Sequence, residues 1–154
     1  MIQKLEPYLE TAFLNWRGSD DPLTRAVIER EIRAHHQGEC TIFVAVQGES
    51  IVGTVQLRFH NTDSELGDGR TRGYIQALDI HPAHRRQGLA TALMNDLETF
   101  ALASQFTTLT LMVEPDNDPA IALYTNLGYA PFKRSSWHWK GVSRPTVCFL
   151  KTIS

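Results

Sequence analysis

Two apolar, β-branched runs flank one long helical stretch in the middle of the chain. The runs are "YIQALDI" at residues 74–80 and "TTLTLMV" at residues 107–113. A strand, a long helix and a second strand in this order form a crossover, which requires the two strands to lie parallel in one sheet. The helix begins after Gly88 and is expected to run for about eighteen residues. Its apolar stripe consists of Leu89, Leu93, Leu97 and Phe100.

Two further helices are expected before the first of these strands. One follows Pro7 and ends near Gly18, with an apolar side made of Leu9, Phe13 and Trp16. The next has Asp21 as its N-cap, Pro22 at its first helical position and Gly38 as its terminator. We expect its apolar face to contain Leu23, Val27, Ile28 and Ile32.

Antiparallel pairing is expected in the rest of the sheet. "CTIFVAV" and "IVGTVQLRF" are separated by a short glycine turn that contains Gln47, Gly48 and Glu49, a pattern typical of a β-hairpin. Residues 60–73 are rich in Gly, Asp, Ser and Thr and predict a long surface loop. The stretches "FKRSSWHWKG" and "PTVCFLKTI" predict two final strands. Together these elements predict a three-layer α/β fold, in which a mixed, largely antiparallel central sheet is flanked by helices.

Chain length and net charge limit the classes of protein to which this chain can belong. A chain of 154 residues has the size of one ordinary domain, so we expect a single domain over residues 1–154. A net charge of −2 argues against general nucleic-acid binding, which depends on clustered positive charge. The start "MIQKLEPYLE" has no apolar stretch of signal-peptide length, and no eighteen apolar residues run together. We therefore expect a cytoplasmic protein with no nucleic-acid or membrane partner.

The two cysteines do not form a metal-binding pattern. Cys40 and Cys148 lie far apart, and neither has a second cysteine nearby. Both lie in apolar runs, so core packing is favoured over a disulfide or a catalytic thiol. We expect no metal site.

The turn before the long helix carries the clearest chemical signal. In "HPAHRRQGLATALM", residues 81–94, two arginines and one glycine directly precede the helix. A helix N-terminus leaves backbone N–H groups without intrahelical partners and carries a partial positive charge. Gly88 removes the side chain where a ligand would approach the backbone, while Arg85 and Arg86 add full charges. These features suit a pyrophosphate group.

Residues 74–132 resemble the core of the GNAT acetyltransferases. The acetyl-coenzyme A motif of that family is Gln or Arg, two residues, Gly, one residue, then Gly or Ala, and "RRQGLA" at residues 85–90 matches it. A second hallmark of the family is an Asn before a short helix that ends in Leu-Tyr and Leu-Gly-aromatic. "LMVEPDNDPAIALYTNLGYAPF" resembles this hallmark, with Asn117 or Asp118 as the cap of the helix. The usual first strand of the family is short or missing, since only residues 1–5 could supply it.

The resemblance implies acetyl-coenzyme A (acetyl-CoA) as the cofactor and an N-acetyltransferase as the activity. In the family, the strand segment that matches Leu78–Ile80 pairs with the pantetheine arm, and the turn before the helix binds the pyrophosphate. Tyr124 occupies the position of the usual general acid, and Asn117 reaches the cofactor. The cofactor-binding residues implied in this way are Leu78, Asp79, Ile80, Arg85, Arg86, Gln87, Gly88, Leu89, Ala90, Thr91, Asn117 and Tyr124.

The family reaction is direct attack of a primary amine on the thioester, without an acyl-enzyme. The amine must be neutral, so a base is needed, and Asp79, His81 and Glu114 are candidates. We place Asp79 first and take Tyr124 and Asp79 as the catalytic pair. Many family members that acetylate protein N-termini carry an acidic residue where this chain has Met112, which weakens an N-terminal peptide as the acceptor. It does not exclude one, and we expect the acceptor to be a small molecule or a peptide.

Two other functions compete with this interpretation. A non-catalytic acyl-CoA sensor or interaction module would keep "RRQGLA" but would not need Tyr124. A dinucleotide-binding domain is disfavoured because no G-x-G-x-x-G follows an early strand. Family members often form dimers, so a homodimer is possible.

Overall fold

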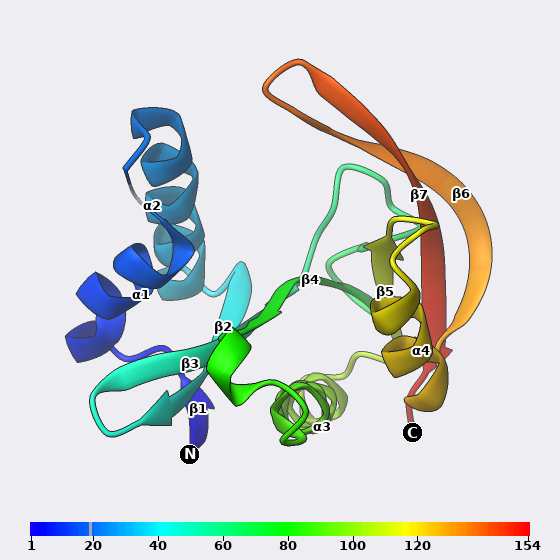
Figure 1. The fold of residues 1–154 in the computed structure, drawn as a ribbon. Coiled ribbons are helices and arrows are strands. Elements are labelled where there is room, and N and C mark those ends of the chain that lie inside the picture. The colour runs from blue at the N-terminus through cyan, green and yellow to red at the C-terminus, as the bar shows by residue number, and fades with distance from the viewer. Residues whose placement is uncertain (19) are drawn as a thin grey trace. The chain divides into compact units, whose positions relative to one another are not determined.

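The computed structural model describes residues 1–18 and 20–154, which form one seven-stranded sheet and four α-helices (Figure 1). The strands are β1 (Ile2–Lys4), β2 (Cys40–Gln47), β3 (Ser50–Arg58), β4 (Arg72–Ile80), β5 (Thr108–Val113), β6 (Ala130–Trp139) and β7 (Val142–Thr152). The helices are α1 (Glu10–Arg17), α2 (Pro22–His36), α3 (Leu89–Ala103) and α4 (Asp118–Asn126), with short 3-10 turns η1 (Pro7–Leu9) and η2 (Pro82–His84).

The strand order confirms the predicted mixed sheet. It is β1-β2-β3-β4-β5-β7-β6. β4 and β5 pair in parallel across the α3 crossover, whereas β1–β2, β2–β3, β5–β7 and β6–β7 pair antiparallel. The expected short first strand is present as β1, whose three residues pair with β2. No helix in residues 1–18 or 20–154 is long and apolar enough to cross a membrane.

The chain divides into two compact units. The first consists of residues 1–58 and 77–99, and the second of residues 59–76 and 100–154. β4 contributes to both, because the division falls between Gln76 and Ala77. The single domain expected from chain length stays a prediction.

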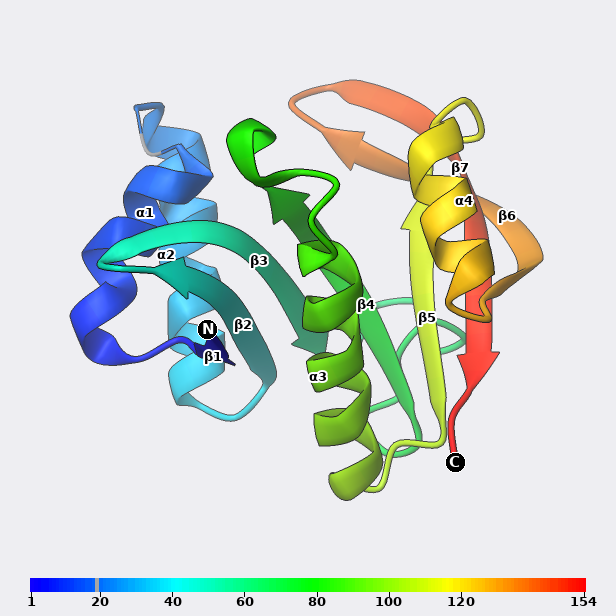
Figure 2. The ribbon, with the colours of Figure 1, turned by 60° about the horizontal axis from the view of Figure 1, so that its bottom comes forward.

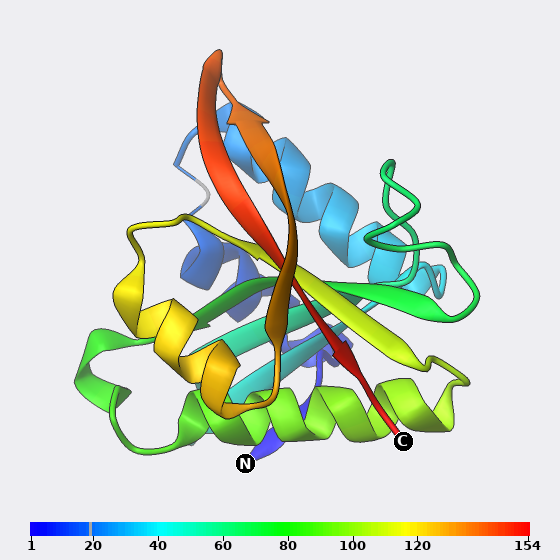
Figure 3. The same cartoon turned by 90° about the vertical axis from the view of Figure 1, so that its right-hand side faces the viewer.

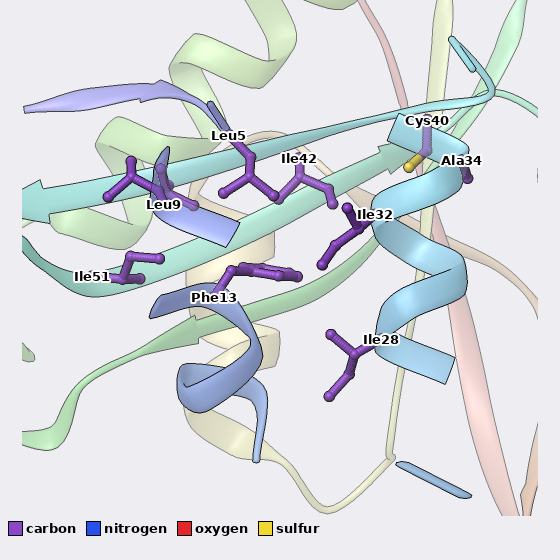
Figure 4. Packing of buried hydrophobic residues seen from close by; sticks show 10 residues of the cluster. Leu5, Leu9, Phe13, Ile28, Ile32, Ala34, Cys40, Ile42 and Ile51 are labelled. Atoms are coloured by element: carbon purple, nitrogen blue, oxygen red, sulfur yellow. The ribbon is translucent and has the colours of Figure 1, made fainter. Parts of the chain in front are cut away.

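In the first unit, α1 and α2 cover one face of β2 and β3. Figure 4 shows Phe13 of α1 between the strands and the isoleucines of α2. Ile28 and Ile32 of α2 are buried as expected, but Leu23 is 50% exposed, so its placement on the apolar face was wrong. Periodicity did not identify two further buried positions, Ala34 and Glu31, of which Glu31 is a buried charge on the inner side of α2.

The part of α3 that belongs to the first unit packs on the opposite face of the strands. A Cβ atom at Gly53 of β3 would lie 3.2 Å from Leu93 and 2.8 Å from Ile80, so a glycine is required for this approach. Leu93, Met94 and Leu97 are fully buried. Figure 2 shows α3 running along the strands, and the helix has 15 residues rather than about eighteen.

Glu31 joins α2 to α1 and to β3. Its carboxylate, 6% exposed as a residue, accepts hydrogen bonds from Arg17 Nε at 3.3 Å, Arg17 Nη2 at 2.9 Å and Gln56 Nε2 at 3.0 Å. Buried carboxylates of this kind are stable only when they are paired and hydrogen-bonded. The cluster therefore fixes the C-terminal end of α1 against the sheet.

In the second unit, β6 and β7 form a long twisted hairpin beside β5, and α4 lies next to its base (Figure 3). The predicted loop ends at residue 71, because Arg72 and Gly73 already belong to β4. The loop is not simply solvated. Leu66 packs with Tyr74 and Cys148, and its carbonyl oxygen accepts a hydrogen bond from Thr110 Oγ1 at 2.5 Å.

Replacing Glu31 by Ala should destabilise the protein by about 2 kcal/mol, because Arg17 and Gln56 lose their shared acceptor. Glu29 on the same helix pairs with Arg25 on the surface, so Glu29→Ala is the matched control, with an expected change below about 0.5 kcal/mol. Urea unfolding of both variants gives the comparison. Equal losses would show that the buried cluster has no special role.

Candidate active site

The turn between β4 and α3 is exposed, and its backbone is left-handed at two positions. After Ile80, the His81 N–H donates to the Val52 carbonyl at 2.8 Å and closes the strand. Arg86 then has φ +62° and Gly88 has φ +80°, and residues 85–88 are all exposed. Turns of this type can direct successive N–H groups toward one point.

The start of α3 has the properties of an anion cradle. The first intrahelical bond at this end runs from the Ala92 N–H to the Gly88 carbonyl at 3.0 Å. Among the backbone hydrogen bonds of the described residues, none is donated by the N–H groups of Leu89, Ala90 and Thr91. A Cβ atom at Gly88 would meet nothing within 4 Å, so the space in front of the turn is open. The residues present therefore fit a phosphate group.

The two arginines of the turn have different roles. Arg85 Nε donates to the Ile80 carbonyl at 3.1 Å, and Arg85 Nη2 lies 3.9 Å from Asp79 Oδ1. Arg85 thus ties the turn to the end of β4. Arg86 has no hydrogen bond or ion pair among residues 1–18 and 20–154, so its guanidinium is available to a ligand.

The strand segment before this turn contains a backbone irregularity. Ala77 has φ +57°, which is uncommon for a residue other than glycine and strained within a strand. The ladder between β4 and β5 extends only from Arg72–Thr108 to Ile75–Leu111. Of the three residues expected to pair with pantetheine, Ile80 is buried, Leu78 is half-buried and Asp79 is exposed.

Asn117 is the N-cap of α4, which decides between the two alternatives that the sequence left open. Its Oδ1 accepts a hydrogen bond from the Ala120 N–H at 3.3 Å, while Asp118 is the first helical residue. Asn117 is exposed, and the cap uses its oxygen. The side-chain NH₂ group therefore remains the group that could donate to a ligand.

Tyr124 combines a buried ring with an accessible hydroxyl group. The residue is 9% exposed, and its ring packs edge-on against Tyr129 with centroids 6.1 Å apart. Its hydroxyl has no hydrogen-bond partner in the part of the chain that the structure describes. Every buried side-chain oxygen there has a partner, so the hydroxyl oxygen of Tyr124 must be exposed to solvent. Burial raises the pKa of Tyr124 to about 12, and the phenol stays protonated at neutral pH.

Tyr74 is a residue that sequence analysis missed. It lies on β4 opposite Thr110, and burial raises its pKa to about 12, with smaller contributions from Cys148 and Tyr124. Tyr74 therefore lies close enough to Tyr124 for their charges to interact. No local motif marks Tyr74, because its position depends on the pairing of β4 with β5.

The three candidate bases differ in geometry. His81 Nδ1 accepts a hydrogen bond from the Ala83 N–H at 3.1 Å, so Nε2 carries the proton of the neutral ring and cannot accept another. This argues against His81. The Asp79 side chain is 60% exposed, and Glu114 Oε1 lies 3.7 Å from Arg144 Nε. Both carboxylates retain free acceptor positions.

The two thiols are packed in the core, as their sequence context suggests. Cys40 Sγ donates to the Glu31 carbonyl at 3.7 Å, and burial raises its pKa to about 11. Burial also raises the pKa of Cys148. Both are free and buried, and a thiol with a raised pKa is a poor nucleophile at neutral pH.

Comparison with known proteins decides the family. The profile of the Acetyltransferase (GNAT) family matches residues 4–129. The chain belongs to the GNAT family. An acetyltransferase of Yersinia pestis is 32% identical to this GNAT protein over 122 residues, which cover 78% of this chain and 79% of the relative.

Solved structures share the fold. The ribosomal-protein-alanine N-acetyltransferase of Brucella melitensis has a TM-score of 0.80 at 13% identity and covers 99% of each chain. NAA60 of Arabidopsis thaliana, solved in complex with acetyl-CoA, has a TM-score of 0.79 at 19% identity and covers 99% of this chain and 98% of its own. These likenesses confirm the GNAT fold of the protein.

Spectroscopic titration of the tyrosines should show a step near pH 12 that includes Tyr74 and Tyr124. Tyr74→Phe and Tyr124→Phe should each remove one tyrosine from that step. Because the folded pKa lies above the unfolded value of about 10, the stabilisation by each neutral phenol is complete below pH 10 and declines as pH approaches 12. A variant whose lost absorbance falls near pH 10 would contradict the burial of that ring.

Proposed function

We propose that this GNAT protein transfers the acetyl group of acetyl-CoA directly to a primary amine of a small molecule or a peptide. The observation that carries the proposal is the open start of α3, with unpaired N–H groups behind Gly88. The family to which the chain belongs supports acetyl transfer in general. The acceptor and the direct mechanism are part of the proposal.

The turn and the strand segment hold the cofactor in this proposal. The N–H groups of residues 88–91 donate to the pyrophosphate, and Arg86 adds charge beside it. The backbone of Leu78–Ile80 pairs with the pantetheine arm, and Asn117 contributes its NH₂ group. Bound acetyl-CoA supplies the activated thioester, and the protein supplies position and proton transfer.

Tyr124 donates a hydrogen bond to the sulfur as negative charge develops there. Its pKa of about 12 lies some 3.5 units above a thiol pKa of about 8.5, so complete proton transfer is uphill by about 5 kcal/mol. Burial thus makes early proton transfer less favourable than for a free tyrosine. We infer that Tyr124 Oη acts mainly as a donor and that the thiolate takes its proton late.

Asp79 is the proposed base. Its carboxylate is exposed on the segment proposed to pair with the arm, and it accepts the amine proton directly or through water. Deprotonating an aliphatic amine with a pKa of about 10.4 at pH 7 costs about 4.6 kcal/mol, against about 1.4 kcal/mol for an α-amine with a pKa of about 8. A base therefore matters more for an aliphatic amine.

Met112 lies at the position where many N-terminal acetyltransferases have an acidic residue. Its sulfur accepts a hydrogen bond from Thr146.

Gly88→Glu should weaken acetyl-CoA binding at least about thirtyfold, because a like charge about 4 Å from the pyrophosphate costs on the order of 2 kcal/mol. Gly48→Glu is the matched control, since Gly48 has φ +64° and equally open space in the β2–β3 turn. Both variants should lose about 1 kcal/mol of stability from backbone strain. Calorimetry measures the affinities. Equal affinities of the two variants would refute the cradle.

Tyr124→Phe should leave acetyl-CoA affinity unchanged and slow acetyl transfer by about tenfold to a hundredfold. The measurement is thiol release from acetyl-CoA with a panel of primary amines. Wild-type protein that binds acetyl-CoA but releases no thiol with any amine would favour the non-catalytic sensor. An undiminished rate in Tyr124→Phe would assign the residue to core packing alone.

A further inference from the structure

Two polar contacts connect α1 to the strained residue of β4. Trp16 Nε1 donates to Thr54 Oγ1 at 3.1 Å, and Thr54 Oγ1 lies 3.4 Å from the Ala77 carbonyl oxygen. The indole N–H can only donate, and the hydroxyl has a single hydrogen. The chain of bonds therefore has one direction, from Trp16 through Thr54 to Ala77.

Thr54 buries a hydroxyl group inside the first unit. It lies in β3 and is 0% exposed, where an apolar β-branched residue would avoid burying a hydroxyl group. Its hydroxyl is the side-chain group that reaches the carbonyl of Ala77, the residue with φ +57°. A strained conformation of this kind persists only where its surroundings hold it.

Trp16 also contacts the other end of the same segment. The centroids of its ring and of the His81 ring lie 6.3 Å apart, and His81 directly follows Ile80. His81 is itself fixed by its bonds to Val52 and Ala83. Trp16 is thus connected to both ends of residues 78–80. It reaches Ala77 through Thr54 at one end and contacts His81 at the other, and we call these contacts the bracket.

The end of α1 that carries Trp16 is held by the buried cluster around Glu31. Arg17, the residue after Trp16, makes two hydrogen bonds to the buried carboxylate of Glu31. Glu31 is bonded in turn to Gln56, two residues beyond Thr54 on β3. The end of α1 cannot shift relative to β3 without breaking this cluster.

We propose that Trp16 and Thr54 are positioning residues that hold residues 78–80 in the conformation that pairs with the pantetheine arm of acetyl-CoA. This inference rests on the proposed function. Neither residue needs to touch the cofactor. Loss of the Thr54 hydroxyl would remove one hydrogen bond from the Ala77 carbonyl and loosen the strand segment that follows it. That change lowers affinity for the arm and leaves the diphosphate cradle intact.

The test compares Thr54→Val, Thr54→Ser and the control Thr41→Val, a buried threonine of β2. Calorimetry measures binding of acetyl-CoA and of 3′-phospho-ADP, the part of coenzyme A that lacks the arm. Thr54→Val should bind acetyl-CoA about tenfold more weakly, and Thr54→Ser should stay within about twofold of wild type. Thr41→Val should match wild type, and all four proteins should bind 3′-phospho-ADP alike.

Unchanged acetyl-CoA affinity in Thr54→Val would overturn the proposal, and so would an equal loss of affinity for both ligands. If Thr54→Val does not fold, Trp16→Phe replaces it in the test, because this change removes the N–H donor and keeps an aromatic ring. Trp16→Phe should then bind acetyl-CoA more weakly and 3′-phospho-ADP as wild type does. A wild-type protein that binds neither ligand would contradict the proposed function itself. Wild-type binding with an unaltered Thr54→Val variant would contradict the bracket alone.

Discussion

The start of α3 is the constraint on which the rest of the site depends. Three N–H groups there have no acceptor in the described part of the chain, and Gly88 leaves the space in front of them open. Such donors are costly if they are desolvated without a partner, and they are well suited to an anion. The surrounding features serve this arrangement, since Gly53 lets α3 pack closely on the strands and Arg85 ties the turn to Ile80.

Buried polar groups link the helices and strands of the same unit. Glu31 joins α1, α2 and β3, and the neighbouring Trp16–Thr54 contact reaches the strained residue Ala77. Apolar packing alone would hold these elements together but would tolerate small displacements. Directional hydrogen bonds limit such displacements, which suits the proposed pairing of residues 78–80 with a ligand.

Local signals in the sequence predicted most of the elements. Asp21, Pro22, Gly38 and Gly88 set helix limits through capping and backbone freedom, which act within a few residues. Two positions of α2 differ from the predicted apolar face. Leu23 is exposed, and Glu31 is buried because it has partners on α1 and β3 that periodicity cannot reveal.

The candidate site shows the same difference between local sequence signals and contacts that depend on the fold. The family motif pointed to the turn of residues 85–90, whose backbone the structure describes and whose role in binding stays a prediction. It did not identify Tyr74 or Thr54, whose surroundings are set by strand pairing and helix packing between distant segments. His81 was a reasonable base by residue type, and only its bond to the Ala83 N–H argues against that role.

The most direct test of the central claim is amide hydrogen exchange across residues 85–92 with and without saturating acetyl-CoA. If the start of α3 binds the pyrophosphate, exchange of the Leu89–Thr91 amides should slow by about tenfold or more on binding. Protection of other amides, with exchange at residues 89–91 unchanged, would contradict the account.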